Sequence, residues 1–185
     1  MRRIIFPMRA SVFIATSLDG YIARPDGGLD WLPDEPEEHG YEAFLASVDA
    51  LVIGRKTFDT VMGFPDWPYG SKPVFVLSRT LKSAELPAGV VCEFLAGEPA
   101  EVAAALDGRG VRHAYVDGGQ TITGFLEAGL IQRMVITRIP VLLGAGIPLF
   151  GALGRDLRWI HEGTRTFPSG LVQSAYRLDG LGPGD

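Results

Sequence analysis

The chain has 185 residues, of which 46% are hydrophobic and 21% are charged, and its formal net charge is −5. A chain of this length folds by default as one domain that buries about 70% of the surface exposed in its unfolded state. The acidic balance excludes the broad basic face with which proteins bind nucleic acids or anionic membranes, so any anion site has to be local. The single cysteine, Cys92, cannot form an internal disulfide, and we expect a cytoplasmic protein.

The N-terminal segment combines basic and apolar residues, but its apolar run is too short for the core of a signal peptide. We expect residues 1–8 to be an extension, with Met8 as an alternative start. Residues 9–180 then form one domain and residues 181–185 a tail. No stretch of the sequence approaches the ~18 uninterrupted apolar residues that a membrane span needs.

The first predicted element is a strand over residues 10–16, whose apolar residues run almost without alternation, as in a central strand covered on both faces. It ends in the polar segment 17–20, and a short apolar stretch follows at 21–23. In α/β folds, a central strand that opens into such a loop is where ligands bind. The alternative for Asp19 and Gly20 is a tight turn with no further role.

A second buried strand, 51–54, ends at a glycine and opens into Arg55, Lys56 and Thr57, followed by one or two helical turns to Met62. The free N–H groups at such a helix start, together with two cations, can hold a phosphate without a metal. The alternative is a surface turn with two solvated cations.

Two later strands end in the same way. The strand 73–77 is followed by Ser78 and Arg79, and the strand 113–116 by the segment Asp117-Gly118-Gly119-Gln120-Thr121 and a helix over 122–130. Paired glycines let a backbone approach a pyrophosphate closely, because no Cβ stands in the way. The repetition predicts that neighbouring strand ends share one anionic ligand.

The remaining elements complete an α/β pattern. We expect helices at 39–49 and 98–106, a short strand at 90–94, one long strand or two joined at a proline over 132–143, a tight apolar loop at 144–150, and an antiparallel edge strand at 171–178. The loop contains a G-x-G without the third glycine or the strand-to-helix context of a Rossmann fingerprint. The three histidines are scattered and there is one cysteine, so the sequence predicts no metal site.

The order of these motifs resembles the dihydrofolate reductase-like superfamily. More closely it resembles the stand-alone relatives of the bacterial riboflavin-biosynthesis reductase domain, over residues 9–178. The segments that carry the resemblance are S-L-D-G-Y-I-A (17–23), D-A-L-V-I-G-R-K-T-F (49–58), V-F-V-L-S-R (74–79), V-D-G-G-Q-T (116–121) and M-V-I-T-R-I-P-V-L-L-G-A-G-I-P-L-F (134–150). The resemblance implies an α/β, three-layer dihydrofolate reductase-like fold, with a mixed, mostly parallel sheet of about eight strands flanked by helices. By the same analogy we expect a homodimer, formed through residues 141–150.

The resemblance also implies an NADPH site. Ala15 and Ile22 would lie beside the nicotinamide, and Leu77, Ser78 and Arg79 at the adenosine 2′-phosphate. The residues implied at the other phosphates are Gly54, Arg55, Lys56, Thr57, Gly118, Gly119, Gln120 and Thr121. A preference for NADP follows, because a 2′-phosphate needs cations where NAD would need a carboxylate.

The activity implied is that of an NADPH-dependent reductase of the 5-amino-6-(5-phosphoribosylamino)uracil reductase type, acting on a small molecule. The alternatives are a dihydrofolate or pterin reductase, and a nucleotide-binding member without turnover. Thr137 resembles a strand threonine near the substrate, and Asp30 beside Trp31 would suit a flat heterocycle, although Trp31 is equally consistent with a core or lid residue. The candidates for the catalytic proton donor are Asp19, Asp30 or an ordered water.

Overall fold

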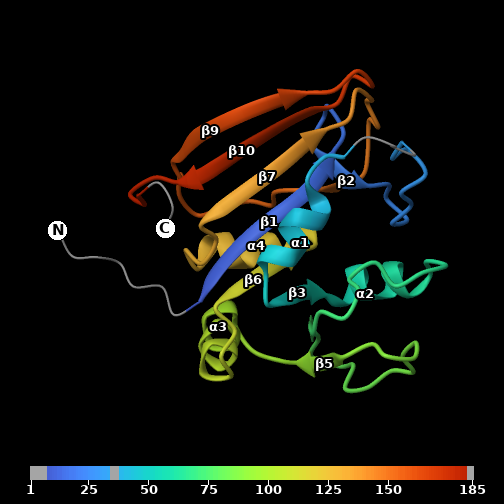
Figure 1. Ribbon diagram of the computed structural model, residues 1–185, viewed down its shortest axis with the longest axis vertical. Coiled ribbons are helices and arrows are strands. Elements are labelled where there is room, and N and C mark those ends of the chain that lie inside the picture. The colour runs from blue at the N-terminus through green and yellow to red at the C-terminus, as the bar shows by residue number, and fades with distance from the viewer. Residues whose placement is uncertain (1–7, 34–37, 183–185) are drawn as a thin grey trace.

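A mixed sheet of eight strands, in the order β5-β4-β3-β6-β1-β7-β10-β9, forms the centre of the computed structural model (Figure 1), which describes residues 8–33 and 38–182. Neighbouring strands from β5 to β7 are parallel, whereas β10 is antiparallel to both β7 and β9. The strands are β1 (Arg9–Thr16), β3 (Ala50–Gly54), β4 (Val74–Leu77), β5 (Cys92–Leu95), β6 (His113–Asp117), β7 (Arg133–Arg138), β9 (Trp159–Thr166) and β10 (Val172–Leu178). The predicted mixed, mostly parallel sheet is confirmed.

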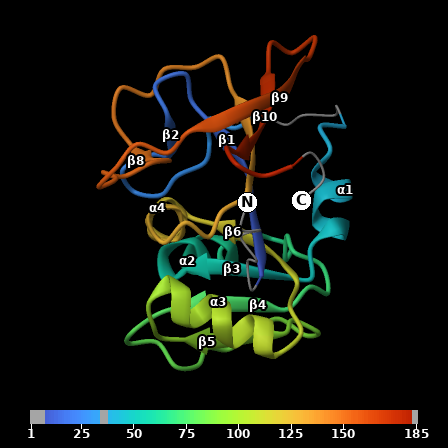
Figure 2. The same cartoon turned by 90° about the vertical axis from the view of Figure 1, so that its left-hand side faces the viewer.

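Helices cover both faces of the sheet, and Figure 2 shows β1 and β6 between α1 on one side and α4 on the other. The helices are α1 (Tyr41–Ser47), α2 (Arg55–Met62), α3 (Pro99–Gly108) and α4 (Gly119–Glu127). Helices α3 and α4 pack on one hydrophobic cluster, and α1 and α2 on a second one. All four residues of β3 that precede Gly54 are fully buried between these layers, and burial of the three large side chains, Leu51, Val52 and Ile53, stabilises the fold by about 1.5–3 kcal/mol each.

A second, two-stranded sheet joins β2 (Tyr21–Ala23) to β8 (Ile147–Pro148). The sequence predicted a tight loop at β8, where the structure has this short antiparallel pairing. The long strand expected over 132–143 ends at Arg138, before Pro140, which has no N–H to donate to a ladder. Within the following segment Leu142 is 70% exposed, and the homodimer contact expected there stays a prediction.

One prediction about the last strands was wrong, and one strand was missed. Strand β10 is not at the edge of the sheet, because it pairs with β7 on one side and β9 on the other. Strand β9 was not predicted at all, since its sequence W-I-H-E-G-T-R-T has no sustained apolar alternation and six of its eight residues are exposed. Only pairing with β10 makes this segment a strand, and polar side chains are common on such edges.

The structure moves the predicted N-terminal boundary of the domain slightly. Met8 is 1% exposed and belongs to the core, so the domain includes at least one residue of the expected extension. Residues 1–7, 34–37 and 183–185, which hold the rest of that extension and part of the acidic run, lie outside the described residues. Among the helices that the structure describes, none has the length and apolar content to cross a membrane.

Candidate nucleotide and acceptor site

Two helix starts lie side by side at the carboxyl edge of the sheet. Strands β3 and β6 are neighbours, with Ile53 in register with Asp117, and each leads through a glycine into a helix. Neither of these N-cap residues, Gly54 before α2 and Gly118 before α4, provides a side-chain cap. The N–H groups of both helix starts therefore remain available for an anion.

Each of these two turns needs its glycine because the other turn is so close. A Cβ on Gly54 would lie 2.7 Å from Thr121 Oγ1, and a Cβ on Gly118 would overlap Thr57 Oγ1. Gly118 also has a φ of +97°, a conformation that side chains disfavour. The structure thus brings the two predicted turns together into one cradle, and the binding of dinucleotide phosphates in it stays a prediction.

A third strand end adds cations beside the cradle. Leu77 is in register with Gly54, so Ser78 and Arg79 follow at the same edge of the sheet. The Ser78 hydroxyl accepts a hydrogen bond from the Leu81 N–H at 2.9 Å and shapes this turn. The Arg79 side chain is exposed and has no ion pair within residues 8–33 and 38–182, which suits it to a phosphate.

The two cations after β3 differ from each other. Arg55 Nε is 2.8 Å from the Asp59 carboxylate one turn along α2, so part of its charge is already compensated. Lys56 is exposed and makes no ion pair in the part of the chain that the structure describes. Of the two, Lys56 is the freer to meet a phosphate.

The loop between β1 and β2 is tied to the segment before β8 by Asp19. Its carboxylate accepts hydrogen bonds from Ser17 Oγ at 2.6 Å, Gly144 N at 2.7 Å and Leu143 N at 3.2 Å. These bonds, that from Ser17 foremost, lower the pKa of the Asp19 carboxyl. An anion held in this way is a poor proton donor at neutral pH, and the arrangement indicates that Asp19 positions the loop.

This loop reaches the nucleotide cradle. The Ile22 Cδ1 atom lies 3.4 Å from the position of a Cβ on Gly119, and the Leu149 N–H donates to Gly20 O at 3.0 Å. Ile22 therefore lies beside the turn that begins α4, and its place beside the nicotinamide stays a prediction. Ala15, the last residue but one of β1, is in register with Thr137 of β7.

Asp30, the other predicted acid, is engaged by a cation. Its carboxylate accepts hydrogen bonds from Arg24 Nε at 2.6 Å and Arg24 Nη2 at 2.9 Å, which lower the pKa of the Asp30 carboxyl. The adjacent Trp31 is half-buried, and its Nε1 has no hydrogen-bond partner among the described residues. A catalytic role for Asp30 and a substrate contact for Trp31 stay predictions, and the ion pair counts against Asp30 as an acid.

A third carboxyl group, that of Asp117 at the end of β6, was not predicted from the sequence as part of the site. It lies beside the Tyr69 hydroxyl, at 3.5 Å, and accepts a hydrogen bond from the Gly118 N–H at 2.8 Å. Burial raises the pKa of Asp117 to about 6, against the ordinary 3.8. An acid directly between a buried strand and a glycine pair was the signal in the sequence that could have identified it.

Asp117 belongs to a row of side chains on the α1 face of the sheet. Tyr115 is in register with Ser11, Ala15 with Thr137, and Thr137 with Gln173. Residues in register on neighbouring strands, and those two apart on one strand, project from the same face. The row therefore runs from Asp117 on β6 through β1 to the buried pair Thr137 and Gln173, where Gln173 Nε2 donates to Thr137 Oγ1 at 3.0 Å.

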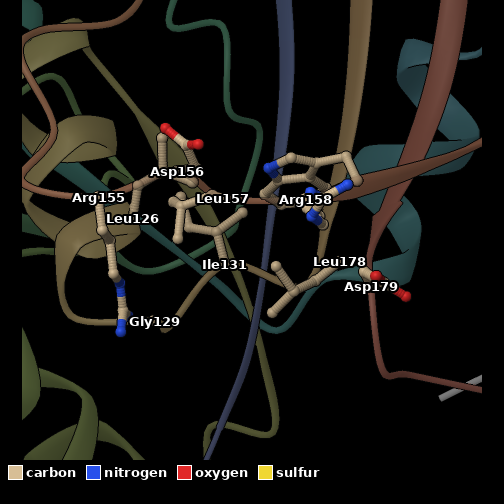
Figure 3. Close-up of a pocket in the computed structure, with 10 residues that line it drawn as sticks. Leu126, Gly129, Ile131, Arg155, Asp156, Leu157, Arg158, Leu178 and Asp179 are labelled. Carbon is tan, nitrogen blue, oxygen red and sulfur yellow. The ribbon is translucent and has the colours of Figure 1, made fainter.

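A half-open pocket of about 310 Å³ lies elsewhere (Figure 3), between the C-terminal end of α4, the segment before β9 and the end of β10. Its lining residues are Leu126, Gly129, Ile131, Arg155, Asp156, Leu157, Arg158, Trp159, Leu178 and Asp179. None of them belongs to the strand ends described above, so this pocket is not part of the candidate site.

The fold and this site define the class of the protein, a dihydrofolate reductase-like α/β protein. The dihydrofolate reductase of Enterococcus faecalis, solved in complex with NADP(H) and RAB-propyl, matches 95% of this chain and 98% of its own with a TM-score of 0.66. At 18% sequence identity this likeness concerns the fold alone.

The comparisons also identify the family to which the chain belongs, within this fold class. Residues 10–173 match the model of the RibD C-terminal domain, and the chain belongs to that family. A crystal structure from Shewanella sp. PV-4, named provisionally for riboflavin biosynthesis, is 44% identical with a TM-score of 0.84 over 93% of this chain and 99% of that one. The uncharacterized protein YwjB of Bacillus subtilis (strain 168) is 34% identical over 84% of this chain and 90% of its own.

Proposed function

We propose that the protein is an NADPH-dependent reductase that transfers a hydride to a small heterocyclic or ribosylamino acceptor, of the 5-amino-6-(5-phosphoribosylamino)uracil reductase type. The observation that carries the proposal is the contact between the glycine turns that begin α2 and α4, next to the Asp117 carboxyl group. Family membership supports the reductase class. A cytoplasmic, small-molecule enzyme remains our expectation.

In this proposal the chain binds the cofactor through backbone and cations. The N–H groups of the α2 and α4 starts and the Lys56 side chain bind the phosphates, and Arg79 binds the 2′-phosphate. Ala15 and Ile22 orient the nicotinamide and exclude water from it. When bound, NADPH supplies the hydride.

The reduction of a C=N or C=O bond also needs a proton. We assign this proton to the Asp117 carboxyl group, which is the acid in the site whose pKa is raised toward neutrality. The acceptor carbon gains the hydride while the acceptor nitrogen or oxygen gains the proton from Asp117, which is left as a carboxylate. A proton from solvent then restores the acid for the next turnover.

The geometry speaks against the alternative of a pterin reductase. In dihydrofolate reductases proper, which this chain resembles, an acidic residue on the helix before the G-R turn contacts the pterin ring. Helix α1 instead packs Tyr41 and Phe44 on the sheet, while Glu42 is exposed and Glu38, which precedes the helix, accepts a hydrogen bond from Gly40 N.

Calorimetric titration with NADPH, and with NADH in parallel, tests the cofactor site. We expect NADPH to bind more tightly than NADH, and Arg79→Ala to weaken NADPH binding by about tenfold, toward the NADH level. Arg158→Ala is the matched control, because it removes an exposed arginine from the pocket of Figure 3, away from the site. Equal affinities for the two nucleotides, or no binding, would refute the proposal.

A further inference from the structure

One side chain of the loop between α2 and β4 points into the protein. Within residues 63–73, all of which the structure describes, Tyr69 alone is buried, at 3% exposed. Its ring belongs to the hydrophobic cluster on which α1 and α2 pack, and the Trp67 ring lies edge-on to it, with 5.3 Å between the centroids. The loop therefore holds this one side chain in a fixed place inside the fold.

The Tyr69 hydroxyl group faces the acid that we assign as the proton donor. Its oxygen lies 3.5 Å from Asp117 Oδ2, while the other carboxyl oxygen, Oδ1, accepts a hydrogen bond from Gly118 N at 2.8 Å. A separation of 3.5 Å is long for a hydrogen bond, and such bonds between catalytic groups often shorten only when the reactants are bound. Each oxygen of the carboxyl group thus has one donor of its own.

Three tyrosine hydroxyl groups face the Asp117 carboxyl group: Tyr41 from α1, Tyr69 from the loop and Tyr115 from β6. Burial raises the pKa of all three above the ordinary value of 10, so they stay protonated and uncharged at neutral pH. The single proton of Tyr115 is already donated to Phe13 O at 2.8 Å. Tyr41 makes no hydrogen bond to Asp117 in the described part of the chain. Tyr69 is therefore the phenol whose proton is available to Asp117.

We propose that Tyr69 is a positioning residue for the proton donor: its hydroxyl holds one oxygen of the Asp117 carboxyl group and stabilises the carboxylate that remains after the proton has left. In this step the acceptor nitrogen or oxygen gains the proton, and the Tyr69 O–H and the Gly118 N–H both donate to the carboxylate. The proposal rests on the proposed reductase function and adds a residue to its chemistry.

The ring and the hydroxyl group of Tyr69 act in opposite directions on Asp117. Burial of the carboxyl group raises its pKa, whereas a hydrogen bond donated to the carboxylate lowers that pKa, because it favours the charged form. A variant that keeps the ring and loses the hydroxyl group therefore separates the two effects, and Tyr69→Phe is that variant. Without the hydroxyl group, Asp117 should be a weaker acid than in the wild type.

The first test is the dependence of kcat on pH, measured by NADPH oxidation with 5-amino-6-(5-phosphoribosylamino)uracil. In Tyr69→Phe we expect the alkaline limb, which lies near pH 6 in the wild type, to move up by about one pH unit. Below the limb kcat should fall about fivefold, because a weaker acid gives up its proton more slowly. A limb that stays in place, with kcat lowered equally at every pH, would show that Tyr69 only packs the loop and would overturn the proposal.

Tyr41→Phe is the matched control. It also removes a buried, uncharged hydroxyl group that faces Asp117, but one that makes no hydrogen bond to Asp117 within residues 8–33 and 38–182. The alkaline limb should therefore stay at its wild-type position in this variant. An equal movement of the limb in both variants would contradict the role of the Tyr69 hydrogen bond.

A second test follows Asp117 without turnover. Carboxyl carbon NMR titration of the ligand-free protein, with the Asp117 signal identified from Asp117→Asn, should give a higher Asp117 pKa in Tyr69→Phe than in the wild type and in Tyr41→Phe. The same pKa in all three proteins overturns the proposal, whether or not the protein reduces an acceptor. Failure of the proposed function is a different result: a wild type that does not bind NADPH in preference to NADH.

Discussion

The two halves of the candidate site are built in different ways. The nucleotide half consists of backbone at glycine turns, where Gly54 and Gly118 each lie against a threonine of the other turn. The acceptor half consists of side chains from four strands and from the loop after α2, in a row that begins at Asp117. A phosphate cradle of backbone N–H groups tolerates no extra carbon, whereas a row of side chains can change its chemistry without disturbing the fold.

The largest effect is expected from a substitution that disrupts the nucleotide half of the candidate site. Gly118→Ala introduces a Cβ that overlaps Thr57 Oγ1 at a φ of +97°, and we expect NADPH affinity to fall by at least about 100-fold. Gly89→Ala is the control, since Gly89 has a similar φ of +82° but open space around it, and should cost only about 1 kcal/mol of stability. The measurements are calorimetric titration and thermal unfolding. Equal loss of affinity in the two variants would show that the contact between the turns is unimportant.

The second prediction separates chemistry from cofactor binding. Asp117→Asn removes the proton donor, so we expect kcat to fall about 100-fold while the Kd for NADPH stays unchanged. In the wild type the proposed donor is protonated only below its pKa of about 6, so kcat should decline as the pH rises through that value. The pH–rate profile of the variant should lack this alkaline limb. A pH–rate profile of both proteins checks this, and an identical alkaline limb in the variant would assign the proton to another group.

The same substitution has a predicted effect on stability. A carboxyl group whose folded pKa is raised stabilises the fold below its unfolded pKa near 3.8, and loses that contribution as the pH rises through about 6. Asp117→Asn stays neutral and should therefore unfold with a free energy about 2–3 kcal/mol higher than the wild type at pH 8, with almost no gain at about pH 3. Urea unfolding at both pH values measures the difference.

The smallest predicted effect concerns the loop that joins the two halves. Asp19→Ala removes the acceptor of the Leu143 and Gly144 N–H groups, and we expect kcat to fall about tenfold because Ile22 is no longer held against the α4 turn. Glu93→Ala, which breaks the exposed pair with Arg109, is the control and should leave kcat within about twofold. Hydrogen exchange of residues 17–23 and 141–149 should increase in Asp19→Ala alone. A loss of kcat without increased exchange would return Asp19 to the list of catalytic acids.

The sequence by itself determined the nucleotide half and the class of fold. The strand-glycine-helix segments at Gly54 and Gly118 are local patterns in which a few consecutive residues contain both the element and the residues proposed to bind phosphate, so they can be recognised without the structure. The parallel strands, being covered on both faces, also stand out as apolar runs.

Only the tertiary structure decided the acceptor half. The pKa of Asp117 is raised because Tyr69 and Tyr115, which are far apart in the chain, enclose its carboxyl group. Asp19 holds its loop in place because residues 143–144 fold back and donate hydrogen bonds to its carboxylate. Strand β9 exists only as a partner of β10, for the same reason. Burial, register and hydrogen-bond partners arise from contacts between distant segments, and no short stretch of the sequence contains them.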